Sequence, residues 1–415
     1  MALLLQGDPG ISSSIEKVFV VEMTHQDIGF TAPPSEVAQD CHDQIVDALD
    51  LSDSWQDFRW TIECSWQLEQ FHLRSVASER DRLRQRFQQG RFVLGAAYVS
   101  PHSGMFGEEL LNRIVFPSAR MAIPYGARFD TALLDDVPGF TRAMPRALSQ
   151  AGVKYLLLGA NNFIGGKPDI PLAHRPFWWE SPGGDRVLTW LTYGSYAEGY
   201  GDWGLMNLNS AYNKLSQRLP EFEAAGYPYD AVLVMRGFDN HGPNWGMTWL
   251  ARQWNQRYQN PEIIVATPAE FFEHLETKYG DVFPVYRGDA SGMWGSIAQM
   301  TPATHALVRR AQAALPGVET LQAVAHGTSP EYPAEKIWNA WTRALAFLEH
   351  SGGGPSSPGM LTKPQVELQN EEFAALAVAC SDGVIALKKS ALALLAPEKV
   401  PLGETGIVAL NPSSD

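Results

Sequence analysis

A histidine and an aspartate, His25 and Asp27, stand two residues apart just after an apolar run that ends at Glu22. In an extended backbone, residues two apart point to the same side, so this imidazole and this carboxylate could bind one divalent ion from the end of a strand. The alternative is a surface pair with no function. The preceding strand pattern and Gly29, which favours a turn, support a metal site.

A second candidate is the aspartate pair Asp135 and Asp136 in the sequence DDVPG, which precedes the predicted helix Pro138–Gln150. A carboxylate in such a turn could be presented to a cleft as a nucleophile or a metal ligand. It could equally be the N-cap of the helix, because aspartate is favoured at that position and proline in the first turn. The motif alone leaves both interpretations open.

A third candidate is the run RGFDNHGPN, residues 236–244, which also follows a predicted strand. Its polar side chains could bind hydroxyl groups, and His241 could be a further metal ligand. A polar loop without function is the alternative.

Predicted strands directly precede the first and the third motif. From Val18 to about Pro268, short apolar runs alternate with amphipathic stretches such as Glu79–Gln88, which indicates parallel strands joined by helices. Seven such strands could close into a (β/α) barrel or form an open doubly wound sheet. Polar clusters after nearly every strand favour the barrel, because barrels carry their active sites at that end. The predicted strands are Val18–Glu22, Phe58–Ile62, Phe92–Tyr98, Tyr155–Leu158, Val187–Tyr193, Ala231–Arg236 and Ile263–Ala266.

The polar and aromatic clusters at the strand ends also supply candidates for binding a sugar. Aromatic rings can stack on a sugar, and amides can bind its hydroxyl groups. The candidates are Trp66, Asn161, Tyr193 and Asn240.

The pattern changes after residue 286. Three long helical segments follow, Thr301–Ala325, Ala334–Glu349 and Pro364–Leu395, and they predict a three-helix bundle packed against the barrel. We therefore expect a metal-binding catalytic domain over residues 1–286 and the bundle over 287–400. Residues 401–415, which read as a strand and a turn, are expected to begin a C-terminal β-domain that is cut short.

Composition narrows the class of protein. With 32 Lys and Arg against 46 Asp and Glu, the formal charge is −14, and no basic stripe suits nucleic acid. No run of 18 apolar residues predicts a membrane span. The three cysteines are far apart and show no metal-binding spacing, which fits a cytoplasmic protein.

Taken in order, three segments resemble the catalytic region of glycoside hydrolase family 38, the zinc-dependent α-mannosidases. The closest likeness is to a branch with THxDIGFT and DVPG motifs, and it extends over most of the chain. The segments are VFVVEMTHQDIGFT (18–31), DDVPGFTRAMPRALSQAGVKYLLLGAN (135–161) and RGFDNHGP (236–243).

The resemblance implies that His25, Asp27 and Asp136 bind zinc and that Asp136 is also the nucleophile of a retaining glycosidase. The family's later histidine is missing from YRGDASGMWGS, residues 286–296, so His241 or Asp289 would be the fourth ligand. We favour His241, because imidazole is the better zinc ligand.

No motif identifies the general acid. Asp202 and Asp239 are the main candidates for it, and Glu63, Glu198 and Glu349 remain open.

Two further histidines have a functional and a structural interpretation. His350 could reach the cleft or interact with the dipole at a helix end, and His102 could contact substrate or cap a turn.

The resemblance implies a carbohydrate substrate, of the α-mannoside type or related to it, and homo-oligomers of the kind common in the family. Two alternatives stay open. One is a metal-dependent, deacetylase-like hydrolase, in which zinc would activate water. The other is a sugar-binding homologue without activity.

Overall fold

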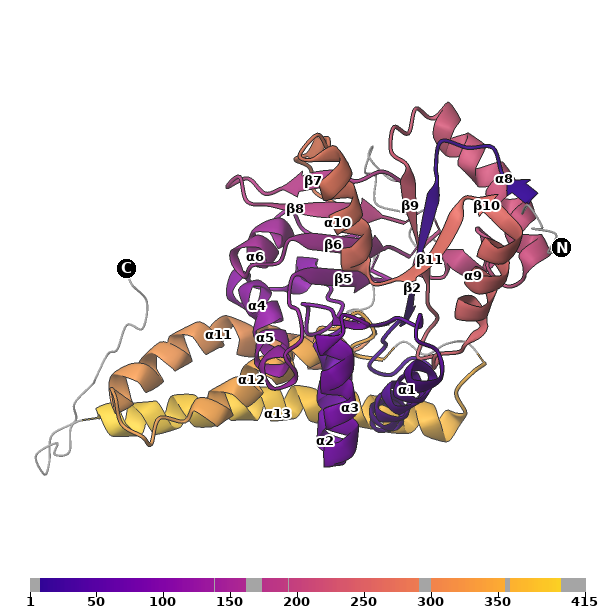
Figure 1. Cartoon of the computed structure of the whole chain (residues 1–415). Helices are drawn as coiled ribbons and strands as arrows, with labels where there is room; N and C mark the ends of the chain where they lie inside the picture. The colour runs from indigo at the N-terminus through magenta and orange to yellow at the C-terminus, as the bar shows by residue number, and fades with distance from the viewer. Residues whose placement is uncertain are drawn as a thin grey trace, which may run out of the picture.

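The computed structural model describes residues 8–137, 139–161, 174–192, 194–290, 300–354 and 359–396. In this part of the chain, helices surround two β-sheets, and three long helices run along one side of them (Figure 1). The predicted α/β class is therefore found.

The first sheet is organised around β2, Lys17–Thr24, which is buried from Val18 onwards. A strand covered on both faces is expected to be an almost continuous apolar run, as VFVV is. β2 pairs in parallel with β9 and β11 along its first part, and its last two residues pair with β3, which in turn pairs with β4. The bounds are Trp60–Ile62 for β3, Phe92–Leu94 for β4, Ala231–Arg236 for β9 and Glu262–Ala266 for β11.

The second sheet has the order β12-β7-β8-β6-β5. Strands β5, β6 and β8 are parallel, whereas β7 runs antiparallel to β8. The bounds are Thr131–Asp135 for β5, Tyr155–Gly159 for β6, Phe177–Glu180 for β7, Arg186–Leu191 for β8 and Val285–Tyr286 for β12; a separate pair joins β1, Asp8–Gly10, to β10, Tyr258–Asn260.

Each of the seven predicted strands overlaps an observed one, but the strands of the described residues do not close into one barrel. The contacts that we find between the two sheets there are isolated, such as the hydrogen bond from Ala96 N to Thr131 O at 2.8 Å. The prediction also missed β5, which is the strand at one edge of the second sheet. The strand has the sequence TALLD, and its last residue belongs to the DDVPG motif, which was predicted to form a turn.

Ten helices of the described residues accompany the strands. The helix predicted over Pro138–Gln150 begins only at Met144, so Asp136 is not its N-cap. The helices are α1 Pro34–Ser54, α2 Ser65–Arg74, α3 Ala77–Gln88, α4 Glu108–Asn112, α5 Phe116–Tyr125, α6 Met144–Gln150, α7 Glu198–Gly201, α8 Leu208–Ala224, α9 Gly246–Arg257 and α10 Pro268–Tyr279, with 3-10 turns at Ser103–Met105 and Arg113–Val115.

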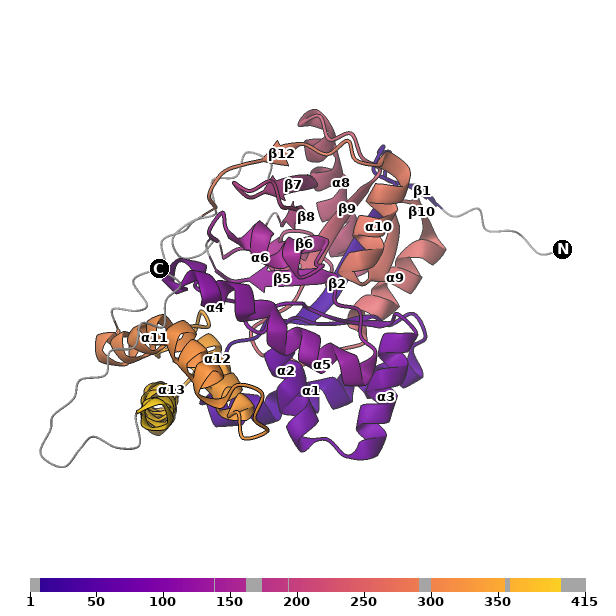
Figure 2. The same ribbon diagram turned by 90° about the vertical axis from the view of Figure 1, so that its left-hand side faces the viewer.

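Three long helices follow the strands: α11, Pro302–His326, α12, Ala334–Phe347, and α13, Lys363–Leu395. They lie close to the segments predicted as helical, and α13 packs along both of the others. Figure 2, which views α13 nearly end-on, shows the three together below the sheets. None of the described helices is long and apolar enough to span a bilayer. Residues 401–415 lie outside the described part.

The α12 helix ends at Phe347, two residues earlier than predicted. Glu349 and His350 therefore lie in the loop that follows α12.

Candidate metal centre

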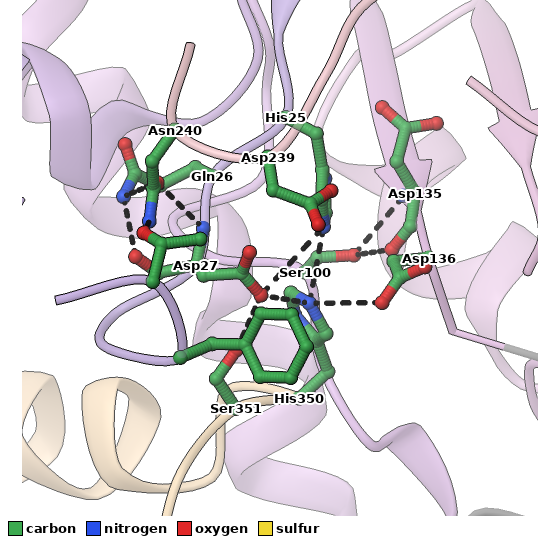
Figure 3. Close-up of polar contacts among 12 residues, drawn as sticks. His25, Gln26, Asp27, Ser100, Asp135, Asp136, Asp239, Asn240, His350 and Ser351 are labelled. Atoms are coloured by element: carbon green, nitrogen blue, oxygen red, sulfur yellow. Dashed lines mark hydrogen bonds and ion pairs between the residues drawn. The ribbon is translucent and has the colours of Figure 1, made fainter. Parts of the chain in front are cut away.

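Four buried side chains from three distant parts of the chain converge at the carboxyl ends of β2 and β5 (Figure 3). His25 and Asp27 follow β2, Asp136 follows β5, and His350 follows α12. One ligand atom of each lies within 4.8 Å of the others. His350 Nε2 is 3.1 Å from His25 Nε2, 2.9 Å from Asp27 Oδ1 and 3.5 Å from Asp136 Oδ2.

A buried glutamate sets the orientation of each imidazole. Glu63 lies 3.1 Å from Nδ1 of His25, and Glu349 contacts Nδ1 of His350. A carboxylate at Nδ1 keeps the proton there, so the lone pair of Nε2 faces the cluster. Two lone pairs that point at each other repel unless a cation or a proton lies between them.

The donor set fits a divalent transition metal, since two imidazole nitrogens and two carboxylate oxygens are ligands that zinc accepts. Within the described residues, Asp27 Oδ2 is buried without a hydrogen-bond partner. A bound cation would satisfy this oxygen. Burial lowers the pKa of His25, but the charge and hydrogen bond of Glu63 together with the charge of Asp27 raise it to about 10, which reflects the excess of negative charge here.

The loop that carries His350 is held by the segment after β4. His350 N donates to Ser100 O at 3.0 Å, and the His102 ring contacts the His350 carbonyl oxygen at 3.0 Å. Gly352 leaves no room for a side chain, because a Cβ there would lie 1.8 Å from Phe347 O. Ser351 Oγ donates to Asp27 Oδ1 at 2.6 Å. His102 thus contacts the loop that carries His350, and its side chain does not cap the turn that begins at Ser103.

The backbone at Asp136 is strained, with a φ of 62° in the left-handed region, which costs energy for a residue other than glycine. This conformation turns the Asp136 carboxylate toward His350, while Asp135 points away from it (Figure 3). Asn161, predicted to bind sugar, donates from Nδ2 to Asp136 Oδ1 at 2.6 Å. Burial raises the pKa of Asp135 well above its usual range.

Asn240, also predicted to bind sugar, fixes the loop after β2. Its Oδ1 accepts from Asp27 N at 3.1 Å and from Gln26 Nε2 at 3.0 Å, and its Nδ2 donates to Thr31 Oγ1 at 2.6 Å. The backbone of Asn240 pairs with that of His25. Its side chain therefore positions the ligands.

Asp239 lies at the edge of the cluster, and Figure 3 places it beside His25. Tyr196, whose ring stacks on His25 at 4.3 Å, donates from its hydroxyl to Asp239 Oδ1 at 2.5 Å. Burial, and after it the charge of Asp27, raises the pKa of the Asp239 carboxyl. A carboxyl group with a raised pKa is suited to donate a proton.

Other predicted residues are not brought to the cluster. His241 is exposed, and the hydroxyl of Thr24 donates a hydrogen bond to its backbone oxygen. Asp202 pairs with Arg218 at 3.6 Å. Trp66 is buried in the core, and Asp289 accepts from Arg142 N at 3.1 Å. Tyr193 lies outside the described residues.

Glu198, one of the open candidates for the acid, is also placed elsewhere. It is buried and accepts from Gly194 N at 2.9 Å and from Met235 N at 3.2 Å, so it holds two strand ends together.

The sequence interpretation favoured His241 as the fourth ligand, whereas the geometry favours His350. The predicted helix continues to Glu349, so an interaction of His350 with the dipole at its end had the same weight as a place in the cleft. The pair Glu349-His350 followed by SGGG was the available signal, because it combines a ligand, its carboxylate partner and a flexible turn.

A comparison with models of known families identifies one family. The sequence profile described as "Glycosyl hydrolases family 38 N-terminal domain" matches residues 16–289. A search among curated proteins gave no match.

Solved structures with a similar fold include two from Enterococcus faecalis. An alpha-mannosidase superposes with a TM-score of 0.74 at 15% identity, and a protein in the Glycosyl Hydrolase Family 38 with 0.67 at 15%. Each match covers 92% of this chain but 42% and 40%, respectively, of the other chain, so this chain spans about two fifths of those structures. An alpha-amylase from Thermotoga maritima gives 0.54 at 10% identity, with 90% of this chain and 95% of that one covered. At such identities the likeness shows the fold alone.

Proposed function

Because this chain belongs to glycoside hydrolase family 38, we propose that it is a zinc-dependent retaining hydrolase of α-mannoside-like or related glycosides. The proposed ligands are His25, Asp27, Asp136 and His350, with Asp136 also acting as the nucleophile. The convergence of their four ligand atoms within 4.8 Å is the observation that carries the proposal.

The two glutamates support a metal rather than a simple hydrogen-bonded cluster. Glu63 and Glu349 are buried with the histidines and lie at their Nδ1 atoms, as the outer partners of metal-binding histidines commonly do. A bound zinc ion would coordinate hydroxyl groups of the sugar and help to orient the ring. The remaining chemistry belongs to side chains of this chain.

In the first step, a carboxylate oxygen of Asp136 attacks the anomeric carbon, and the bond to the leaving oxygen breaks. Asn161 holds the other oxygen, Oδ1, and so fixes the direction of attack. Water then attacks the anomeric carbon of the glycosyl-enzyme and releases Asp136. Two displacements at one carbon retain its configuration.

We assign the general acid to Asp239, because it lies beside the cluster whereas Asp202 is paired with Arg218. Asp239 gives its proton to the leaving oxygen and takes one back from the water in the second step. The hydroxyl of Tyr196 fixes its carboxyl group.

The proposal includes a cytoplasmic location, which the three buried, free cysteines support. Its substrate is a carbohydrate. That the protein forms homo-oligomers remains a prediction.

A fluorinated glycosyl fluoride tests the nucleophile, because it traps the glycosyl-enzyme long enough for peptide mass spectrometry. We expect the label on Asp136, no label in Asp136→Asn, and unchanged labelling in Asp202→Asn. Metal analysis of the same protein should find zinc. A metal-containing protein that removes acetyl groups and takes no label would instead be a deacetylase-like hydrolase, and one without turnover a sugar-binding homologue.

A further inference from the structure

Two loops that are far apart in the chain carry three of the four proposed ligands. The loop after β2, residues 25–33, holds His25 and Asp27, and the loop after α12, residues 348–354, holds His350. His350 Nε2 lies 2.9 Å from Asp27 Oδ1, and Figure 3 shows the side chains of the two loops meeting there. Because metal–ligand distances vary by only about 0.2 Å, the affinity of the centre depends on how the two loops lie relative to each other.

A glutamine of α13, Gln369, contacts both loops. Its Oε1 accepts a hydrogen bond from Phe30 N at 2.9 Å, and its Nε2 donates to Gly354 O at 3.4 Å. The side chain is completely buried, so water cannot replace these bonds. Asn240 holds the first loop and Ser100 holds the second, whereas Gln369 links one loop to the other.

Phe373 lies one turn after Gln369 on α13 and repeats this arrangement with apolar contacts. A Cβ at Gly29 would lie 3.0 Å from the Phe373 ring, so the loop after β2 passes directly over this ring. The ring also meets that of Phe347, the last residue of α12, edge to face with 6.3 Å between centroids. Residues four apart lie on the same face of a helix, so one face of α13 holds both loops.

Both loops adopt backbone conformations that need support. Phe30, whose N–H donates to Gln369, has a φ of 63°, which is strained for an aromatic residue. Gly353 and Gly354 have φ angles of 89° and 117°, which glycine adopts readily. Strained backbone persists only where its surroundings hold it in place. Gln369 therefore stabilises each loop at a point where its backbone could otherwise relax.

We propose that Gln369 is a positioning residue of the metal centre, which fixes the two loops relative to each other and so sets the zinc affinity without contacting the ion. The inference rests on the proposed function and adds to the centre a residue of the third long helix. It also implies that α13 must be docked before the metal binds tightly.

The test is Gln369→Met, which keeps the length of the side chain but cannot donate a hydrogen bond and accepts one only weakly. The matched control is Gln322→Met, because Gln322 on α11 is equally buried but donates to Ser390 Oγ on α13, at 2.8 Å, and to Leu387 O.

Zinc titration with a competing chelator should show an affinity about tenfold lower in Gln369→Met, at the lower end of the loss for outer partners of a metal site. Gln322→Met should keep the zinc affinity of the unchanged protein, although both variants lose buried hydrogen bonds and should unfold at a lower urea concentration. Equal zinc affinity in all three proteins, or the same loss in both variants, would overturn the inference and leave the hydrolase.

Hydrogen exchange in the metal-free protein separates this inference from the proposed function. The amides of residues 25–33 and 348–354 should exchange faster in Gln369→Met than in Gln322→Met. If the unchanged protein binds no zinc, the proposed function fails, and faster exchange in both loops still supports the positioning role. Unchanged exchange in either loop would contradict it. Should Gln369→Met fail to fold, Gln369→Asn, which is too short to reach both loops, replaces it and is compared with Gln322→Asn.

Discussion

Each histidine of the centre depends on its glutamate as much as on its own position. A neutral imidazole has one nitrogen that donates and one that accepts, and Glu63 and Glu349 select Nδ1 as the donor in both rings. Without these carboxylates, the rings could turn or change tautomer and offer an N–H to the cluster. The proposed centre therefore depends on two residues, Glu63 and Glu349, that would not contact the metal themselves.

The fourth ligand is tested by comparing two histidines. His350→Ala removes a nitrogen of the cluster, so we expect zinc affinity to fall more than about 100-fold, beyond the loss typical of outer partners. His241→Ala should keep the affinity of the unchanged protein, because that side chain is exposed. Zinc titration with a competing chelator measures both. The opposite ranking would return the assignment to His241.

The role of Asp239 is tested by the leaving group. Asp239→Asn cannot donate a proton, so we expect kcat/KM to fall by about 10²- to 10⁴-fold for an unactivated disaccharide. For a dinitrophenyl glycoside, whose leaving group needs no proton, the loss should be much smaller. Asp202→Asn serves as the control and should be nearly unaffected. Equal losses on both substrates in Asp239→Asn would rule out the acid role.

At the scale of elements, local patterns predicted most strands and the long helices but not how they assemble. The run at β2 is apolar and ends in His25 and Asp27, so strand and ligands could be read together. The strand β5 was not predicted from the sequence. The absence of a closed barrel could not be predicted either, because closure depends on contacts between distant strands. His350 joins His25 across 325 residues of sequence, and no local spacing records such a contact.

The start of β9 is tied to α10 through Asp230. This aspartate accepts hydrogen bonds from Lys278 at 2.7 Å and Tyr279 at 2.8 Å, and it contacts His274 at 3.1 Å. Burial alone would raise the pKa of Asp230, but these partners outweigh it and lower the pKa. The ionised carboxylate thus stabilises the fold.

Asp230→Asn should lower the free energy of unfolding at pH 7 by about 1–3 kcal/mol, the range for a hydrogen-bonded charged group. Because the folded pKa lies below the unfolded one, this contribution is complete above about pH 4 and is lost as the pH falls through the folded pKa. Urea unfolding at pH 7 and pH 3 measures the difference, which should shrink at pH 3. Asp281→Asn, at an exposed ion pair with Arg186, should change little at either pH.

At the scale of the molecule, the centre joins the two sheets to the three long helices. Its four residues follow β2 and β5 or lie in the loop after α12, and the N-terminal part of α1 also contacts α13 through the bond from Ser35 N to Glu372 at 2.9 Å. A metal bound here would hold these parts together. Zinc should therefore affect global unfolding.

Removal of zinc is expected to lower the thermal midpoint, because a ligand that binds only the folded state stabilises it by about 2.7 kcal/mol at 100 times its Kd. Calorimetry with EDTA and with added zinc measures the change. His350→Ala should melt at the same temperature with and without zinc, while Trp338→Ala should keep the response. A zinc response that persists in His350→Ala would place the ion elsewhere.

The position of His350 in the chain has a consequence for biosynthesis. A ribosome adds this residue 325 positions after His25, so a nascent chain holds an incomplete ligand set until the third of the long helices is about to be made. Glu349 arrives with His350, and the orientation of that imidazole is settled as soon as the loop docks on Ser100. Metal loading would thus report that the loop after α12 has been made and has docked, and a chain in which this loop fails to dock would yield a protein without zinc.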